Sequence, residues 1–166
     1  WVGTLGGGLT WFTNGNFARV PTQRGRPLGN IWSVLVDRAQ RVWVGSSGGL
    51  YRVVDGQLTN VAGIAPRNEV NIHALFEDRD GTIWMGTDRG LVRWSEGQIE
   101  KFGTTNGLPA TSIRCLAQMP DTPDGRLRLV VGTDSAGAFF FDGEKFTQFA
   151  TTNNVGSDEI WALRAE

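Results

Sequence analysis

The stretch Trp84-Met85-Gly86-Thr87 is one of four copies of a short pattern whose repetition decides the fold. The other copies are Trp1-Val2-Gly3-Thr4, Trp43-Val44-Gly45-Ser46 and Val130-Val131-Gly132-Thr133. Their glycines lie 42, 41 and 46 residues apart, and self-similarity at such a period is the sequence signature of a repeat architecture. The chain of 166 residues is therefore predicted to be one array of four repeats, approximately 1–40, 41–81, 82–126 and 127–166.

Each repeat holds four short runs of β-branched and aromatic residues separated by glycine, which is typical of strands joined by hairpins. One run is 31–35, with counterparts at 72–76, 113–117 and 160–164. No segment shows a sustained 3.6-residue period, so no helix is expected. Four strands at this spacing is the period of a β-propeller blade. The sequence thus predicts an all-β propeller of four-stranded antiparallel blades, in a circularly permuted register that starts at a second strand and ends on a first strand.

The tryptophan of the pattern is expected to fill the wedge between blades, because one blade cannot bury both of its faces alone. Cys115 aligns with serine and alanine on the inner strands, so it is interpreted as a small core residue rather than a nucleophile. A ring closed at four blades would pair 158–164 beside Trp1-Val2-Gly3. We expect instead a larger ring, completed by further blades or by a second copy of the chain.

Composition excludes several classes of function. Sixteen Lys+Arg against seventeen Asp+Glu argue against a nucleic-acid partner, which requires a basic face. A single cysteine and a single histidine, His73, leave no internal disulfide, thiolate cluster or multi-histidine site, so we predict no metal and no cofactor. No stretch approaches the ~20 apolar residues that span a bilayer. Because the chain begins within a repeat and without methionine, we expect a fragment of a longer protein.

The run 71–91 resembles the two-component regulator propeller repeat, as does Asn106-Gly107-Leu108-Pro109. The resemblance covers essentially the whole chain, but the repeat around Val130 lacks the tryptophan and contains the insertion Pro120-Asp121-Thr122-Pro123. It implies the periplasmic, extracytoplasmic input region of a membrane-anchored bacterial sensor, whose output is a histidine kinase or a diguanylate cyclase. Several members resemble sensors of oligosaccharides, so the resemblance implies an oligosaccharide ligand.

The candidate ligand-binding residues lie at the mouth of the predicted central channel. The second residues of the inner strands should share one face and would stack on sugars or bond their hydroxyls, although packing between blades also explains them: Trp32, His73, Arg114 and Trp161. Arg24, Arg26 and Arg67, in the loops before the inner strands, would meet an acidic sugar or remain solvated loop charges. Asp88 and Asp134 occupy equivalent positions and would face each other across a channel.

Three functions remain open at this stage. A non-catalytic sensor module is favoured, because the chain shows no catalytic constellation. A carbohydrate lyase or hydrolase would require clustered histidines or a carboxylate pair with a metal at the channel mouth. A docking platform for proteins is the third. Asp78-Arg79-Asp80-Gly81 has only part of a calcium loop and lacks its bidentate glutamate, so a hairpin turn is the preferred interpretation.

Overall fold

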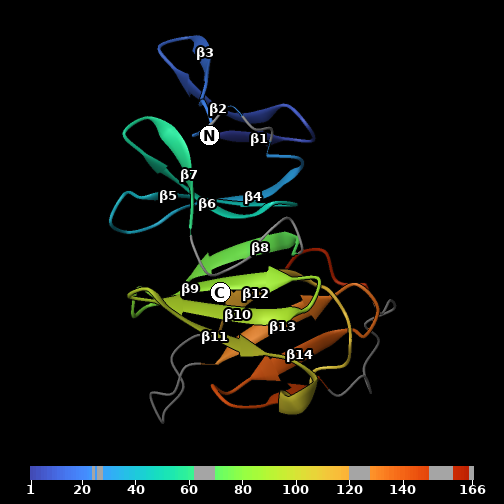
Figure 1. Cartoon of the computed structure of the whole chain (residues 1–166). Helices are drawn as coiled ribbons and strands as arrows, with labels where there is room; N and C mark the ends of the chain where they lie inside the picture. Colours follow the sequence, from blue (N-terminus) through green and yellow to red (C-terminus); the bar gives the residue numbers. More distant parts are fainter. Residues whose placement is uncertain (24, 26–27, 62–69, 120–127, 150–158, 165–166) are drawn as a thin grey trace.

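The computed structural model describes residues 1–23, 25, 28–61, 70–119, 128–149 and 159–164. Within these ranges the chain forms four antiparallel sheets that follow one another along the sequence, with one three-residue 3₁₀ helix, η1. We call the sheets blades 1 to 4. They are stacked in order from blade 1, which carries the N-terminus, to blade 4 (Figure 1). No helix in the described ranges is long and apolar enough to cross a membrane.

Blades 1 and 2 differ in their number of strands. Blade 1 has three strands and lacks an inner one: β1 (Val2–Thr4), β2 (Gly8–Thr13) and β3 (Asn16–Arg19). Blade 2 has four: β4 (Ile31–Val36), β5 (Val42–Ser46), β6 (Gly49–Val54) and β7 (Gln57–Asn60). The chain thus starts at the second strand of a blade, as the repeat pattern predicts.

Blades 3 and 4 also have four strands each. Blade 3 contains β8 (Ile72–Glu77), β9 (Ile83–Thr87), β10 (Gly90–Ser95) and β11 (Gln98–Phe102), and η1 (Thr104–Asn106) follows it. Blade 4 contains β12 (Ile113–Gln118), β13 (Leu129–Thr133), β14 (Ala138–Phe141) and β15 (Phe146–Gln148). Every neighbouring pair of strands in a blade is antiparallel and consecutive in sequence, which is the meander expected of a propeller blade.

Two of the three tryptophans of the repeat fill the wedges between blades, as predicted, whereas Trp1 is 44% exposed and stacks on Trp11 of its own blade. Trp43 and Trp84 are both 0% exposed. Trp43 belongs to an apolar cluster with Met85 of blade 3, and Trp84 to a cluster with Phe141 of blade 4. The indole faces thus supply apolar area that neither blade could bury alone.

Each buried indole is anchored by a carboxylate of its own blade. Trp84 Nε1 donates to Asp78 Oδ2 at 2.7 Å, and the other oxygen of Asp78 accepts the backbone N–H groups of Asp80 and Thr82. The acidic stretch that begins at Asp78 is therefore a hairpin turn that holds a tryptophan. Asp37 holds Trp43 in the same way, at 2.8 Å.

Blade 4 replaces both members of this pair with apolar residues. Met119 follows β12 where Asp78 follows β8, and its N–H bonds Arg128 O as that of Asp78 bonds Thr82 O. Val130 stands in place of the tryptophan and is buried. Losing both partners together is physically reasonable, because either one alone would leave a buried polar group without its bond.

The glycine of the repeat sets how closely one blade approaches the next. A Cβ atom at Gly86 would lie 2.7 Å from Ile113 Cγ2, where β12 begins, and one at Gly132 would lie 2.6 Å from Ile160 Cγ2. Ile160 also donates its N–H to Thr133 O at 2.8 Å. Residues 159–164 therefore lie against blade 4 where the next inner strand would start, but they do not form the strand that the sequence predicts. At the other end of the stack, β1 is an edge strand (Figure 1). In the part of the chain that the structure describes, the four blades form an open stack rather than a closed ring (Figure 1).

Candidate functional site

A β-bulge occurs at the same point of each inner strand. In β4, β8 and β12 the pairing with the second strand skips one residue, which is Trp32, His73 or Arg114. A bulged residue has no partner in the ladder, so its side chain is re-aimed relative to its neighbours. Three of the four residues that the sequence predicts at the channel mouth thus lie at equivalent β-bulges.

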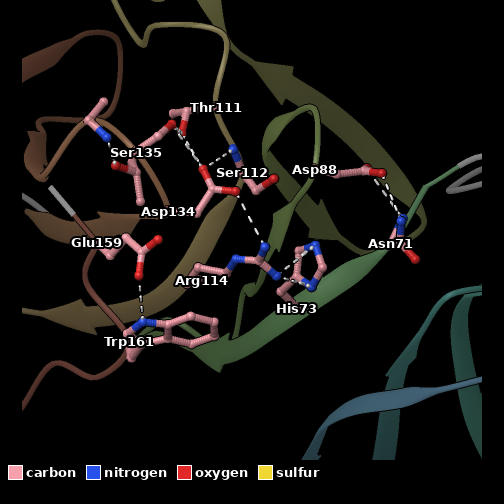
Figure 2. A network of polar contacts seen from close by, with 12 residues as sticks. Asn71, His73, Asp88, Thr111, Ser112, Arg114, Asp134, Ser135, Glu159 and Trp161 are labelled. Atoms are coloured by element: carbon pink, nitrogen blue, oxygen red, sulfur yellow. Dashed lines mark hydrogen bonds and ion pairs between the residues drawn. The ribbon is translucent and has the colours of Figure 1, made fainter. Parts of the chain in front are cut away.

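These residues and Trp161 form one continuous row, which we call the inner row. The ring centres of Trp32 and His73 are 5.5 Å apart. Arg114 Nη1 lies 3.1 Å from His73 Nδ1, and its guanidinium carbon lies 5.4 Å from the centre of the Trp161 ring. Figure 2 shows Arg114 between His73 and Trp161. Blades 2, 3 and 4 and the segment 159–164 each contribute one side chain.

The two ends of the row are open to solvent. Trp32 is 42% exposed and Trp161 is 68% exposed, whereas the wedge tryptophans are fully buried. Neither indole of the row is buried between blades within the described chain. The polar centre of the row is less accessible, with the side chain of Arg114 24% exposed.

Asp134 neutralises the centre of the row. Its Oδ2 lies 3.3 Å from Arg114 Nη2, and its Oδ1 accepts from Thr111 Oγ1 at 2.6 Å and from the Ser112 N–H at 3.2 Å. These bonds, that of Thr111 first, lower the pKa of Asp134 to about 2. The carboxylate therefore stays ionised beside the guanidinium. Arg114 Nε, in contrast, is buried with no hydrogen-bond partner among the described residues.

His73 is neutral in this setting. Its pKa is lowered, first by burial and then by the positive charge of Arg114. A guanidinium only donates hydrogen bonds, and Arg114 Nη1 lies 3.1 Å from Nδ1 of His73 against 3.5 Å from Nε2. The shorter contact favours Nδ1 as the acceptor, which assigns the imidazole proton to Nε2. The inner row thus presents donors between two aromatic faces and carries no uncompensated charge.

The two equivalent aspartates are each bonded to a residue that precedes an inner strand. Asp88 accepts from Asn71 N at 3.2 Å and from Asn71 Nδ2 at 2.9 Å, as Asp134 accepts from Ser112 N (Figure 2). Ser47 occupies the same position in blade 2 and accepts the N–H of Asn30. In blades 2, 3 and 4, the side chain at this position therefore accepts the N–H of the residue just before the inner strand.

The other candidate residues from the sequence do not belong to the inner row. Arg24, Arg26 and Arg67 lie outside the described residues. Cys115 is buried and donates its S–H to Ile160 O at 3.3 Å, and burial raises the pKa of its thiol to about 11, so it is an inert core residue. Within the described ranges, no group of three or more His, Cys, Asp or Glu side chains is placed to hold a metal ion.

The sequence and the fold both have known relatives. Residues 66–89 match the model of the two component regulator propeller family. No curated protein matches the chain. The extracellular domain of BT4673 from B. thetaiotaomicron, assigned as a hybrid two component system, is 23% identical, with a TM-score of 0.72 over 96% of this chain and 23% of that one. A second structure of the BT4673 domain, assigned there to a one component system, gives a TM-score of 0.73 at 23% identity over 96% of this chain and 24% of that one.

A third similar structure is the extracellular domain of BT3049 from the same organism, also assigned as a hybrid two component system. It is 19% identical, with a TM-score of 0.66 over 98% of this chain and 22% of that one. The chain thus spans about a quarter of the length of the solved structures it matches. At this level of identity, the structures establish the fold. The chain is therefore a run of β-propeller blades, of which residues 66–89 are similar to the two component regulator propeller family.

Proposed function

We propose that the chain is a non-catalytic, extracytoplasmic ligand-binding module of a bacterial two-component sensor, and that its inner row binds an oligosaccharide. The family repeat and the three extracellular domains with this fold support the sensor role. The parent protein in this proposal is anchored in the inner membrane, so that the propeller lies in the periplasm. Its output region, a histidine kinase or a diguanylate cyclase, responds to the ligand.

The composition of the inner row supports an oligosaccharide as the ligand. Two exposed indoles flank a polar centre, and saccharides likewise combine apolar ring faces with hydroxyl groups. Trp32 and Trp161 offer flat faces for stacking, while the imidazole of His73 and the partly exposed guanidinium of Arg114 offer hydrogen-bond donors. Because Asp134 compensates the charge of Arg114, a neutral sugar incurs no penalty from an unpaired charge in the row.

Titration calorimetry with neutral oligosaccharides tests this function. Loss of one stacked indole, by Trp161→Ala or Trp32→Ala, should weaken binding by about threefold to tenfold. Trp11→Ala is the matched control, since Trp11 is 43% exposed but stacks on Trp1 in blade 1, outside the row. Equal losses from Trp11→Ala and Trp32→Ala would contradict the proposal. Turnover of a polysaccharide that Asp88→Asn abolishes would establish the enzyme instead, and capture of a protein with no response to any sugar would establish the docking platform.

A second proposal concerns the partner of blade 1. Its outer face exposes Val2, Phe12 and Phe17, at 44%, 56% and 69%. The equivalent positions in blade 2 belong to the apolar cluster packed between blades 1 and 2, and those in blade 3 to the cluster between blades 2 and 3: Val44, Val53 and Leu58, then Met85, Trp94 and Ile99. We propose that a further blade of the same polypeptide covers this face.

A further inference from the structure

A hollow of about 640 Å³ opens between blades 3 and 4 on the side that carries Asp88 and Asp134. Its lining comes from the turn between β9 and β10, from the end of β11, from η1, from the loop before β12 and from the turn after β13. Phe102 and Leu108, both buried, line it together with the hydroxyl-bearing residues Thr104 and Ser135. This combination of apolar wall and a few polar groups is typical of sites for small ligands.

Some of the charged side chains that line the hollow have bonding partners and others do not. Asp134 is paired with Arg114, and each oxygen of Asp88 accepts a bond from Asn71. Arg89 and Lys101 are both exposed at the hollow, and neither side chain has an ion pair or hydrogen bond in the described chain. Two cations against one uncompensated carboxylate leave a local excess of positive charge, which favours an anion.

The hollow and the inner row share a wall. Asp134 lines the hollow, while its Oδ2 accepts from Arg114 in the row (Figure 2). One extended ligand can therefore contact both regions. We propose that the hollow binds the acidic group, a carboxylate or a sulfate, of a saccharide whose remaining rings lie along the inner row. This inference rests on the proposed function and specifies its ligand class as an acidic oligosaccharide.

Arg89 and Lys101 have complementary roles in this arrangement. The planar guanidinium of Arg89 can bond a carboxylate or a sulfate through two N–H groups, and the ammonium of Lys101 acts as a point charge. Neither residue has a structural bond to lose through its side chain, so replacement by glutamine should leave the blades intact.

The test compares tetragalacturonate with its methyl ester, which keeps the sugar scaffold and removes the charge, by titration calorimetry. A sulfated galactan tetrasaccharide distinguishes a sulfate ligand from a carboxylate. We expect at least one acidic probe to bind more tightly than the ester. Arg89→Gln and Lys101→Gln should each weaken that probe by about twofold to fivefold, with little effect on the ester. Lys145→Gln, which removes an exposed lysine between β14 and β15, is the control and should change nothing.

The outcomes separate this inference from the function on which it rests. Ester binding that depends on Trp161, with no preference for acidic probes and no effect of Arg89→Gln or Lys101→Gln, would overturn the acidic subsite and leave the saccharide-binding row in place. Absence of binding by all three probes, the ester included, would contradict both. Equal weakening by Lys145→Gln would show a nonspecific charge effect and would also overturn the subsite.

Discussion

The bond between Trp84 and Asp78 allows the blade architecture to be tested quantitatively. Trp84 is 0% exposed and Asp78 is 2% exposed, and the indole N–H reaches Oδ2 at 2.7 Å. Trp84→Phe leaves that oxygen buried without its donor, and Asp78→Asn can turn a second N–H group toward the indole N–H. A hydrogen bond to a charged group contributes about 1.5–3 kcal/mol, so each replacement should lower the free energy of unfolding by at least that amount.

A double-mutant cycle isolates the bond itself. We expect a coupling energy of about 1.5–3 kcal/mol between Trp84→Phe and Asp78→Asn, measured from urea unfolding followed by circular dichroism. The control cycle pairs Trp84→Phe with Asp80→Asn, because Asp80 lies in the same turn but contributes only its backbone N–H to Asp78. A coupling energy as small as that of the control would refute the account of how the wedge tryptophans are held.

The remaining predictions concern pH and the outer face of blade 1. Since folding lowers the pKa of His73, the free energy of unfolding should fall as pH drops below the unfolded value of about 6.5, and His73→Gln should remove that slope in a series of urea titrations. Asp134 has a pKa of about 2 in the folded chain, so it should contribute about 1–2 kcal/mol above pH 4 that disappears toward pH 2; acid titrations of Asp134→Asn should lack this loss. Phe12→Ser should cost the isolated chain little, since Phe12 is 56% exposed, but should destabilise the full-length protein by about 1.5–3 kcal/mol; equal thermal unfolding shifts in the two would contradict the covered face.

The repeat pattern is sufficient to predict the blades, because the same short motif occurs four times at a nearly constant spacing. The roles of two tryptophans and two glycines of the pattern follow from size alone: Trp43 and Trp84 fill wedges, and Gly86 and Gly132 allow the next isoleucine to approach closely. The repeat pattern alone does not predict the hydrogen bond that Trp84 donates to Asp78. Its signal is nevertheless present in the sequence, since an aspartate precedes the tryptophan by six residues in two repeats and both are absent in the fourth.

The candidate site was predictable only in part. Strand alternation placed Trp32, His73, Arg114 and Trp161 on one face, but it carries no information on the bulges that present the first three. The bond from Thr111 to Asp134 joins residues of different loops, and no local pattern indicates such a contact. The hollow beside Arg89 and Lys101 is likewise lined by segments of two blades that are distant in sequence, so no local pattern predicts it.

The central claim, that the inner row is the saccharide contact, can be tested without any substitution. Oxidation of the tryptophans by N-bromosuccinimide, read out by peptide mass spectrometry, reports which indoles a bound ligand covers. We predict that a saturating oligosaccharide protects Trp32 and Trp161 while Trp11, which is as exposed as Trp32 but lies on blade 1, is oxidised at an unchanged rate. Unchanged oxidation of Trp32 and Trp161 in the presence of a ligand shown to bind would contradict it.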